Sequence, residues 1–111
     1  MSERKAISLL GISRKAGLVC SGGFSVEQAV KSGKAELVIV AADASDNTKK
    51  KFSNMCSFYR VPWATFLDKE RLGQAIGREY RSCLAVTDHN LAEAINKQIA
   101  DSGVTEERWV Q

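Results

Sequence analysis

The chain has 111 residues, of which 44% are hydrophobic and 26% charged, and it carries a formal net charge of +3. This length and composition predict one folded domain and give no case for extended disorder. The longest apolar run, residues 37–42, is far shorter than the roughly 20 residues of a membrane-spanning helix, and the opening MSERKAIS lacks the apolar segment of a signal peptide. We therefore expect a cytoplasmic protein with no membrane partner.

The first predicted helix covers residues 3–16, and Gly17 is its expected stop. Its apolar and small residues recur at helical spacing and share one face. They are Ala6, Leu9, Leu10, Ser13 and Ala16. Residues 18–20 then leave room only for a short strand.

The sequence Ser21-Gly22-Gly23 forms a loop that leads into a second predicted helix, which ends at Gly33. The apolar face of this helix carries Val26, Ala29 and Val30. Two residues could cap the start of this helix. Ser25 is followed three residues later by Gln28, as in a capping box, while Ser21 would cap the helix earlier.

Residues 36–42, ELVIVAA, form a nearly continuous apolar run, which is typical of a strand covered on both faces. Residues 43–48 are turn-like and rich in helix-capping residues. A third helix follows, with Phe52, Met55, Cys56 and Tyr59 at positions i, i+3, i+4 and i+7, and Val61-Pro62 ends it.

The second half of the chain continues this alternation. Residues 62–67 form a predicted strand, Asp68 caps a short helix that ends at Gly77, and residues 82–86 form the last strand. Thr87 or Asp88 then caps the last helix. Because helices and strands alternate with connections too long for hairpins, the sequence predicts an α/β protein with helices on both faces of a mixed or parallel sheet.

The sequence contains no recognisable catalytic or metal-binding motif. Residues 17–23 have the glycine spacing of a nucleotide P-loop, but Gly23 occupies the position of the required lysine. The single histidine, His89, leaves no evident catalytic relay. Cys20, Cys56 and Cys83 stand at wide spacing, so we expect small core residues. No enzyme activity, metal or cofactor is predicted.

The starts of several helices could bind anions, because their N–H groups are free and the helix dipole attracts negative charge. If the sheet is parallel over most of its width, Gly22-Gly23, residues 46–50 and Thr87-Asp88 lie along one edge. With lysines beside them, such an edge would suit a sugar-phosphate backbone. The alternative left open is that Gly22 and Gly23 only allow positive φ in a tight connection.

Five segments follow one another in the order ISLLGISRKAGLVCSG, EQAVKSGKAELVIVAADAS, NTKKKF, VPWATFLDKERLGQAIG and AVTD. This order resembles the kink-turn RNA-binding ribosomal protein family, above all its small bacterial YlxQ-like and YbxF-like members. The resemblance spans roughly residues 4–100, and its specific part is the combination of KSGKAELVIVAADAS with LGQAIG.

The resemblance implies a three-layer α-β-α sandwich around a central four-stranded mixed sheet. It also implies a protein without catalysis or cofactor that recognises sharply bent RNA helices with tandem sheared G·A pairs. Family members contact RNA through the start of the second helix, supported by the loop before the last strand. In this sequence those regions are residues 22–28 and 78–81.

The start of the second helix departs from the pattern of strong kink-turn binders. These have a glycine, a small residue, an asparagine and a glutamate, with a lysine three residues after the glutamate. Gly22 keeps the glycine, but Phe24 replaces asparagine, Ser25 replaces glutamate and Gln28 replaces lysine. The asparagine and glutamate pair with guanine edges, and each lost base-edge contact removes about 1–3 kcal/mol of discrimination. We therefore expect RNA binding of reduced or altered selectivity.

The predicted RNA-binding residues are Gly22, Gly23, Phe24, Ser25, Gln28, Lys49, Lys50, Arg78, Glu79 and Tyr80. Phe24 has two interpretations, an exposed platform on which a base stacks or a helix-entry staple packed into the core, and the staple is preferred. Lys49 and Lys50 either contact phosphates, with Lys34 and Arg14 as neighbours, or belong to a solvated face. Arg78 and Tyr80 could add charge and stacking.

The leading hypothesis is a non-enzymatic protein that binds structured RNA in a ribosomal or other ribonucleoprotein context. The alternative is a protein-interaction module that keeps the fold but has lost kink-turn recognition. A small-ligand or enzyme-accessory role ranks last. The RNA-binding domain is expected over residues 1–103, followed by a short tail, residues 104–111, in which Trp109 could act as a docking handle or cover the fold.

Overall fold

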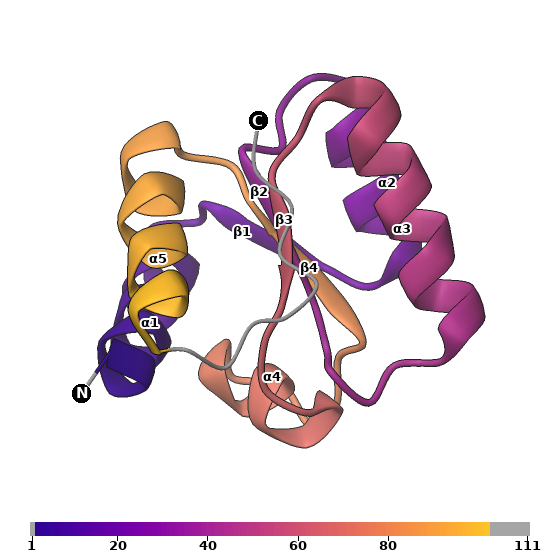
Figure 1. Cartoon of the computed structure of the whole chain (residues 1–111). Helices are drawn as coiled ribbons and strands as arrows, with labels where there is room; N and C mark the ends of the chain where they lie inside the picture. The colour runs from indigo at the N-terminus through magenta and orange to yellow at the C-terminus, as the bar shows by residue number, and fades with distance from the viewer. Residues whose placement is uncertain (1, 103–111) are drawn as a thin grey trace.

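The computed structural model describes residues 2–102, so the predicted tail, with Trp109, lies outside the described residues (Figure 1). Helices and strands alternate along this part of the chain. The helices are α1 (Ser2–Lys15), α2 (Gly23–Lys31), α3 (Asp46–Tyr59), α4 (Lys69–Ala75) and α5 (His89–Ser102). The strands are β1 (Val19–Ser21), β2 (Leu37–Val40), β3 (Trp63–Thr65) and β4 (Cys83–Val86).

The strands form one four-stranded sheet in the order β1-β4-β2-β3. β4 is antiparallel to both β1 and β2, whereas β2 and β3 are parallel. Leu37 of β2 pairs with Val86 of β4, and Val38 pairs with Trp63 of β3. Three strands therefore run in one direction and β4 runs in the other, which confirms the predicted mixed sheet.

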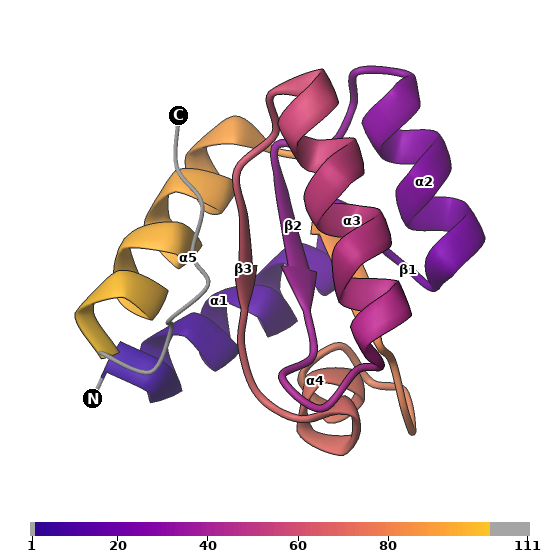
Figure 2. The same ribbon diagram turned by 45° about the vertical axis from the view of Figure 1, so that its right-hand side comes forward.

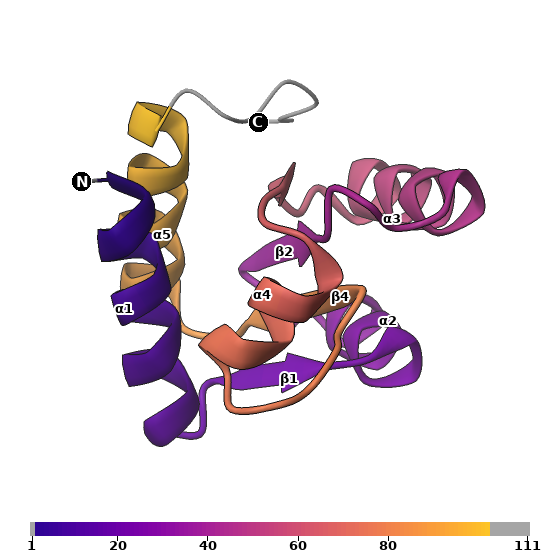
Figure 3. The same ribbon diagram turned by 90° about the horizontal axis from the view of Figure 1, so that it is seen from below.

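Helices cover both faces of the sheet, as predicted. Figure 3 shows α1 and α5 on one face and α2 and α3 on the other, and Figure 1 shows α4 at one end of the sheet. Every residue of β2 and β4 is buried, as expected of strands covered on both faces. The helices complete the core from the two sides with Leu10 and Ile95, and with Val26 and Phe52. No described helix is long and apolar enough to cross a membrane.

Side-chain hydrogen bonds cap three helices, and they confirm the predicted cap Asp68 and one of the two predicted caps of the last helix. Ser45 Oγ accepts from the Thr48 N–H at 3.1 Å, Asp68 Oδ1 from the Arg71 N–H at 2.7 Å, and Asp88 Oδ2 from the Leu91 N–H at 2.9 Å. Asp88 is thus the cap of α5, rather than Thr87. These bonds satisfy backbone donors that the first turn of a helix leaves unpaired.

The predicted caps of α2 are wrong. The helix starts at Gly23, and its N-cap is Gly22, with φ 92° and ψ 152° and no side-chain capping hydrogen bond. Because only glycine adopts this backbone conformation without strain, the chain turns from β1 into the helix before Ser25 is reached. Ser25 therefore lies inside the first turn, and Ser21 remains in β1.

The direction of β4 decides which helix starts share an edge of the sheet. β1, β2 and β3 end at the edge where β4 begins, and Figure 2 shows α2 and α3 starting at that end, near α4. Thr87-Asp88 follows β4 and lies at the opposite edge. The predicted clustering is correct for Gly22-Gly23 and the start of α3, but wrong for Thr87-Asp88, because β4 is antiparallel.

The three cysteines are free thiols, and the expected core position is confirmed for Cys56 and Cys83 but not for Cys20. Cys56 and Cys83 are fully buried, and Cys20 is half-buried in β1. Burial raises the pKa of the Cys56 thiol to about 12, so it stays protonated and apolar near neutral pH. Within residues 2–102 no group of histidine, cysteine and acidic side chains is suited to hold a metal ion.

Candidate functional site

The start of α2 and the loop before β4 are joined into one surface. The Gly22 N–H donates to the Cys83 carbonyl at 3.2 Å, and Arg81 Nε donates to Ser21 Oγ at 2.8 Å. These bonds connect residues about sixty positions apart in the sequence. We call this surface, residues 21–25 and 78–82, the α2 edge.

Gly22 and Gly23 leave the backbone open at the α2 edge. A Cβ atom on either glycine would meet no other atom within 4 Å. The first N–H groups of a helix have no partner inside the helix, and within the described chain no side chain caps them at α2. The α2 edge therefore offers free backbone donors and the positive end of a helix dipole to an anion.

Phe24 is exposed, so the preferred staple interpretation is wrong. Its side chain is 77% accessible to solvent. Helix residues rotate by about 100° each, so a residue two positions before the buried Val26 points to the outer side of α2. The ring is thus available for contact with a ligand.

Ser25 and Gln28 lie on the side of α2 that faces away from α3. Both border a hollow that also includes Cys20 of β1. Glu27 points the other way, towards α3, where it binds Lys51. The structure thereby brings Phe24, Ser25 and Gln28 onto one continuous surface.

Backbone hydrogen bonds fix the loop 78–81 to α4. The Arg78 N–H donates to the Gly73 carbonyl at 2.8 Å, and the Arg81 N–H donates to the Lys69 carbonyl at 3.1 Å. A Cβ on Gly73 would lie 2.8 Å from the Glu79 carbonyl carbon and oxygen and 2.9 Å from the Tyr80 nitrogen. The loop can occupy this position because residue 73 has no side chain.

Arg78, Glu79 and Tyr80 lie in the loop 78–81 of the α2 edge, but Glu79 and Tyr80 turn towards α4. Glu79 and Tyr80 border a hollow of about 310 Å³ together with Glu70 and Gln74. Tyr80 is exposed. The two carboxylates make this hollow unfavourable for phosphate, so Arg78 and Tyr80 are better suited to contact an anion than Glu79.

Arg81 belongs to the predicted loop 78–81 but is not among the predicted RNA-binding residues. Its guanidinium donates to Ser21 Oγ and, through Nη1, to the Tyr80 carbonyl at 2.6 Å. A fixed arginine at this position joins the loop to the start of α2. The pairing with Ser21 could not be found from local sequence, because it depends on β1 and β4 being neighbours.

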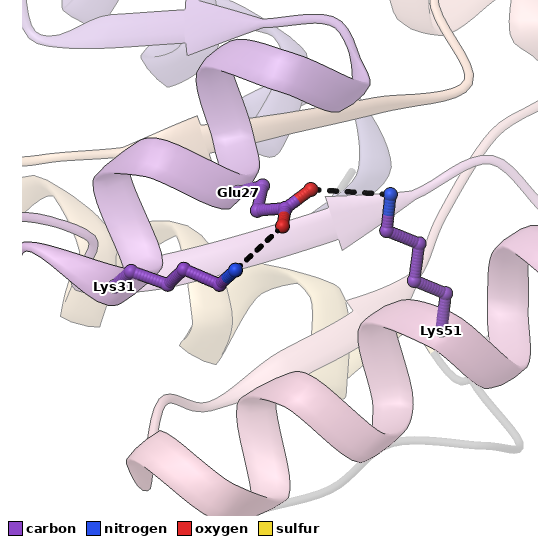
Figure 4. A network of polar contacts seen from close by, with 3 residues as sticks. All are labelled: Glu27, Lys31 and Lys51. Carbon is purple, nitrogen blue, oxygen red and sulfur yellow. Dashed lines mark hydrogen bonds and ion pairs between the residues drawn. The ribbon is translucent and has the colours of Figure 1, made fainter.

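Of the three lysines at the start of α3, Lys51 points towards α2, whereas Lys49 and Lys50 border a hollow on the β3 side. Figure 4 shows that Glu27 binds two ammonium groups, Lys31 Nζ at 2.7 Å and Lys51 Nζ at 3.2 Å. Hydrogen bonds and charge attraction from these lysines lower the pKa of the Glu27 carboxyl. Lys51 is therefore engaged in linking α3 to α2.

Lys49 and Lys50 border a separate hollow of about 380 Å³ together with Asp46, Ser53 and Trp63. Trp63 belongs to β3, at the far end of the sheet from β1. The structure therefore does not bring these two lysines next to Phe24 and Gln28. Of their predicted neighbours, Lys34 borders the hollow beside α2, and the Arg14 guanidinium lies against Gly77.

A family model described as the ribosomal protein L7Ae/L30e/S12e/Gadd45 family matches residues 4–102. The chain is 37% identical over 95 residues to an RNA-binding protein YlxQ of Bacillus subtilis (strain 168), a match that covers 86% of this chain and 95% of that protein. It is 32% identical over 98 residues to an RNA-binding protein YlxQ of Enterococcus faecium, covering 88% and 94%.

Two solved structures have the same fold. A protein of unknown function from Bacillus halodurans C superposes with a TM-score of 0.84 at 33% identity, covering 86% of this chain and 97% of that one. A 15.5kD RNA binding protein of Giardia lamblia superposes with a TM-score of 0.75 at 23% identity, covering 90% and 86%.

Proposed function

The chain belongs to the ribosomal protein L7Ae/L30e/S12e/Gadd45 family, and from this membership we propose that it is a non-enzymatic cytoplasmic protein that binds structured RNA. The names of the YlxQ relatives support this proposal. The observation that carries it is the α2 edge, where free helix N–H groups, the exposed Phe24 ring and Arg81 lie together. Backbone donors and arginine suit phosphate, and an exposed ring suits a base.

The finer proposal concerns which RNA is bound. The resemblance to kink-turn binders favours a bent RNA helix with tandem sheared G·A pairs, in a ribosomal or other ribonucleoprotein context. Phe24, Ser25 and Gln28 stand where such binders have asparagine, glutamate and lysine. We therefore propose weaker or altered discrimination of kink-turns, with affinity supplied by phosphate and stacking contacts.

A titration with two RNAs at two salt concentrations tests this function. The RNAs are a kink-turn and a straight duplex of matched length and composition. Binding through phosphates weakens steeply with salt, and we expect a modest preference for the kink-turn. Absence of binding to either RNA at low salt would contradict the proposal and favour the protein-interaction module. Equal binding to both would reduce it to a nonspecific electrostatic interaction.

A triple variant tests the alignment of the α2 edge with the kink-turn pattern. Phe24→Asn with Ser25→Glu and Gln28→Lys restores the groups that kink-turn binders carry. We expect the preference for the kink-turn over the duplex to rise about tenfold or more, because each base-edge contact contributes about 1–3 kcal/mol of discrimination. The measurement is the ratio of the two dissociation constants, with Phe58→Asn as control. An unchanged ratio would show that the alignment is wrong.

A further inference from the structure

A groove runs along the side of α2 that faces away from α3. Its volume is about 410 Å³, and its wall includes Cys20 of β1, Phe24 and Gln28 of α2, and Lys34 and Thr87. Phe24 lies in the first turn of α2, whereas Lys34 follows the end of the helix and Thr87 follows β4. The groove therefore starts at the α2 edge and continues along α2 to the opposite end of the strands.

Thr87 and Cys20 of this wall hydrogen-bond to the backbone, through Thr87 Oγ1 to the Leu18 carbonyl at 3.1 Å and through Cys20 Sγ to the Ser25 carbonyl at 3.7 Å, but the fold does not use Gln28 and Lys34. Within residues 2–102, the Gln28 side chain makes no hydrogen bond and Lys34 makes no ion pair. Lys31 and Lys51, in contrast, are both bound to Glu27. An exposed aromatic ring, a carboxamide and an ammonium group thus follow one another along a single hollow, as in sites that hold a ligand by a few converging polar groups.

These three groups match the parts of a single-stranded nucleotide. Aromatic rings stack on bases, amides hydrogen-bond to base edges, and lysines neutralise phosphates. A duplex keeps its base faces stacked inside the helix, so only an unpaired strand can place a base on Phe24 and run along the groove. The size of the groove lies within the range of small-ligand sites, roughly 300–1,000 Å³.

We infer that the groove binds a short single-stranded segment of the RNA whose structured part contacts the α2 edge. This inference rests on the proposed function and extends it. A base of the segment stacks on Phe24, Gln28 contacts its edge, and a following phosphate lies near Lys34. With the groove occupied, the RNA interface would extend from the α2 edge to the opposite end of the strands.

Affinity measurements with and without an unpaired strand test the inference. The probes are a blunt kink-turn RNA and the same RNA with a short oligouridine extension at its 5′ or its 3′ end. One extension should tighten binding by about fivefold or more, since one stacked base contributes on the order of 1 kcal/mol. Lys34→Ala should reduce this gain. Lys97→Ala, which removes an exposed lysine of α5, should keep it.

The outcomes separate the two proposals. If blunt RNA binds and neither extension adds affinity, the groove inference is wrong while the proposed function stands. If Lys97→Ala removes the gain as well as Lys34→Ala does, the effect is one of net charge, and the groove is again excluded. If no RNA binds, the proposed function fails and the inference fails with it.

The native Cys20 provides a second, direct measurement. It is half-buried in the groove wall, whereas Cys56 and Cys83 are fully buried and serve as internal controls. Because burial raises the pKa of Cys20, alkylation by N-ethylmaleimide is followed at mildly alkaline pH. The extended RNA should slow the modification of Cys20 more than blunt RNA does. Equal rates with both RNAs would overturn the inference.

Discussion

At the residue scale, Gly73 is the position where the loop 78–81 presses against α4. Gly73→Ala would place a methyl group 2.8 Å from the Glu79 carbonyl, which is backbone and cannot swing aside. We expect a loss of about 1–3 kcal/mol in the free energy of unfolding, despite the better helix propensity of alanine. Urea denaturation measures this loss.

Gly11→Ala is the matched control, because Gly11 also lies inside a helix. Its Cβ would be 3.8 Å from the Ala75 carbonyl, an ordinary contact. This variant should gain up to about 1 kcal/mol. If both variants changed stability in the same direction, the close approach at Gly73 would not be the cause.

Phe24 and Phe58 form a natural pair for a test of function, because both are 77% exposed. Phe24 lies at the start of α2, and Phe58 lies near the end of α3. Either change to alanine should alter the free energy of unfolding by less than about 0.5 kcal/mol. Only Phe24→Ala should weaken RNA binding, by about fivefold to a hundredfold if the ring stacks on a base.

Fluorescence anisotropy with one labelled RNA gives both affinities under the same conditions. An equal loss in the two variants would mean that Phe24 has no special role. No loss in either would remove stacking from the proposed function and leave phosphate contacts alone.

At the element scale, local patterns predicted the existence and type of every helix and strand in the described chain. Apolar periodicity identified the helices, and the run in residues 36–42 identified β2 as a buried strand. The predicted start of α2 was wrong because the sequence offers two serine residues as possible caps. The chain instead turns into the helix at Gly22, which has a φ of 92°. Serine caps can be recognised in a sequence, but the choice of a glycine cap depends on where β1 ends.

The Glu27 network joins two neighbouring elements, α2 and α3. Glu27→Gln removes the charge that holds Lys31 and Lys51, so we expect a small decrease in thermal stability near pH 7. The decrease is small because both lysines are about half exposed, at 48% and 52%. Thermal unfolding of the variant and the wild type measures it.

The pH dependence of this difference follows from the lowered pKa of Glu27. A carboxyl whose pKa is lower in the folded protein stabilises the fold above its ordinary value of 4.5, and this contribution is lost as the pH falls through the folded-state pKa. The wild type and Glu27→Gln should therefore differ near pH 7 and converge in acid. A difference that stays constant down to pH values well below 4.5 would exclude the ion pairs as its source.

At the scale of the whole molecule, the candidate site depends on topology that no local pattern contains. The resemblance to a known family implied the mixed sheet, whereas alternation alone left a parallel sheet open. With β4 antiparallel, Thr87-Asp88 moves to the opposite edge and Arg81 comes within hydrogen-bond distance of Ser21. Sequence reasoning named both segments of the α2 edge but not the contacts that join them, because these contacts connect residues far apart in the sequence.

The distribution of lysines over the molecule leads to a last prediction. Lys49 and Lys50 lie on the β3 side of α3, apart from the groove beside α2. If they bind phosphates of a large RNA, Lys49→Ala with Lys50→Ala should weaken kink-turn and duplex alike. The negative slope of log K against log salt should become less steep, by up to about 0.7–0.9 per lost phosphate contact.

The matched control is Lys5→Ala with Lys97→Ala, which also removes two exposed lysines but from α1 and α5. Both double variants lower the formal net charge by the same amount, so a general field effect would change both affinities equally. A change in slope confined to the α3 variant would mean that the bound RNA extends across α3. If neither slope changes, RNA contacts are restricted to the α2 edge and the adjoining groove.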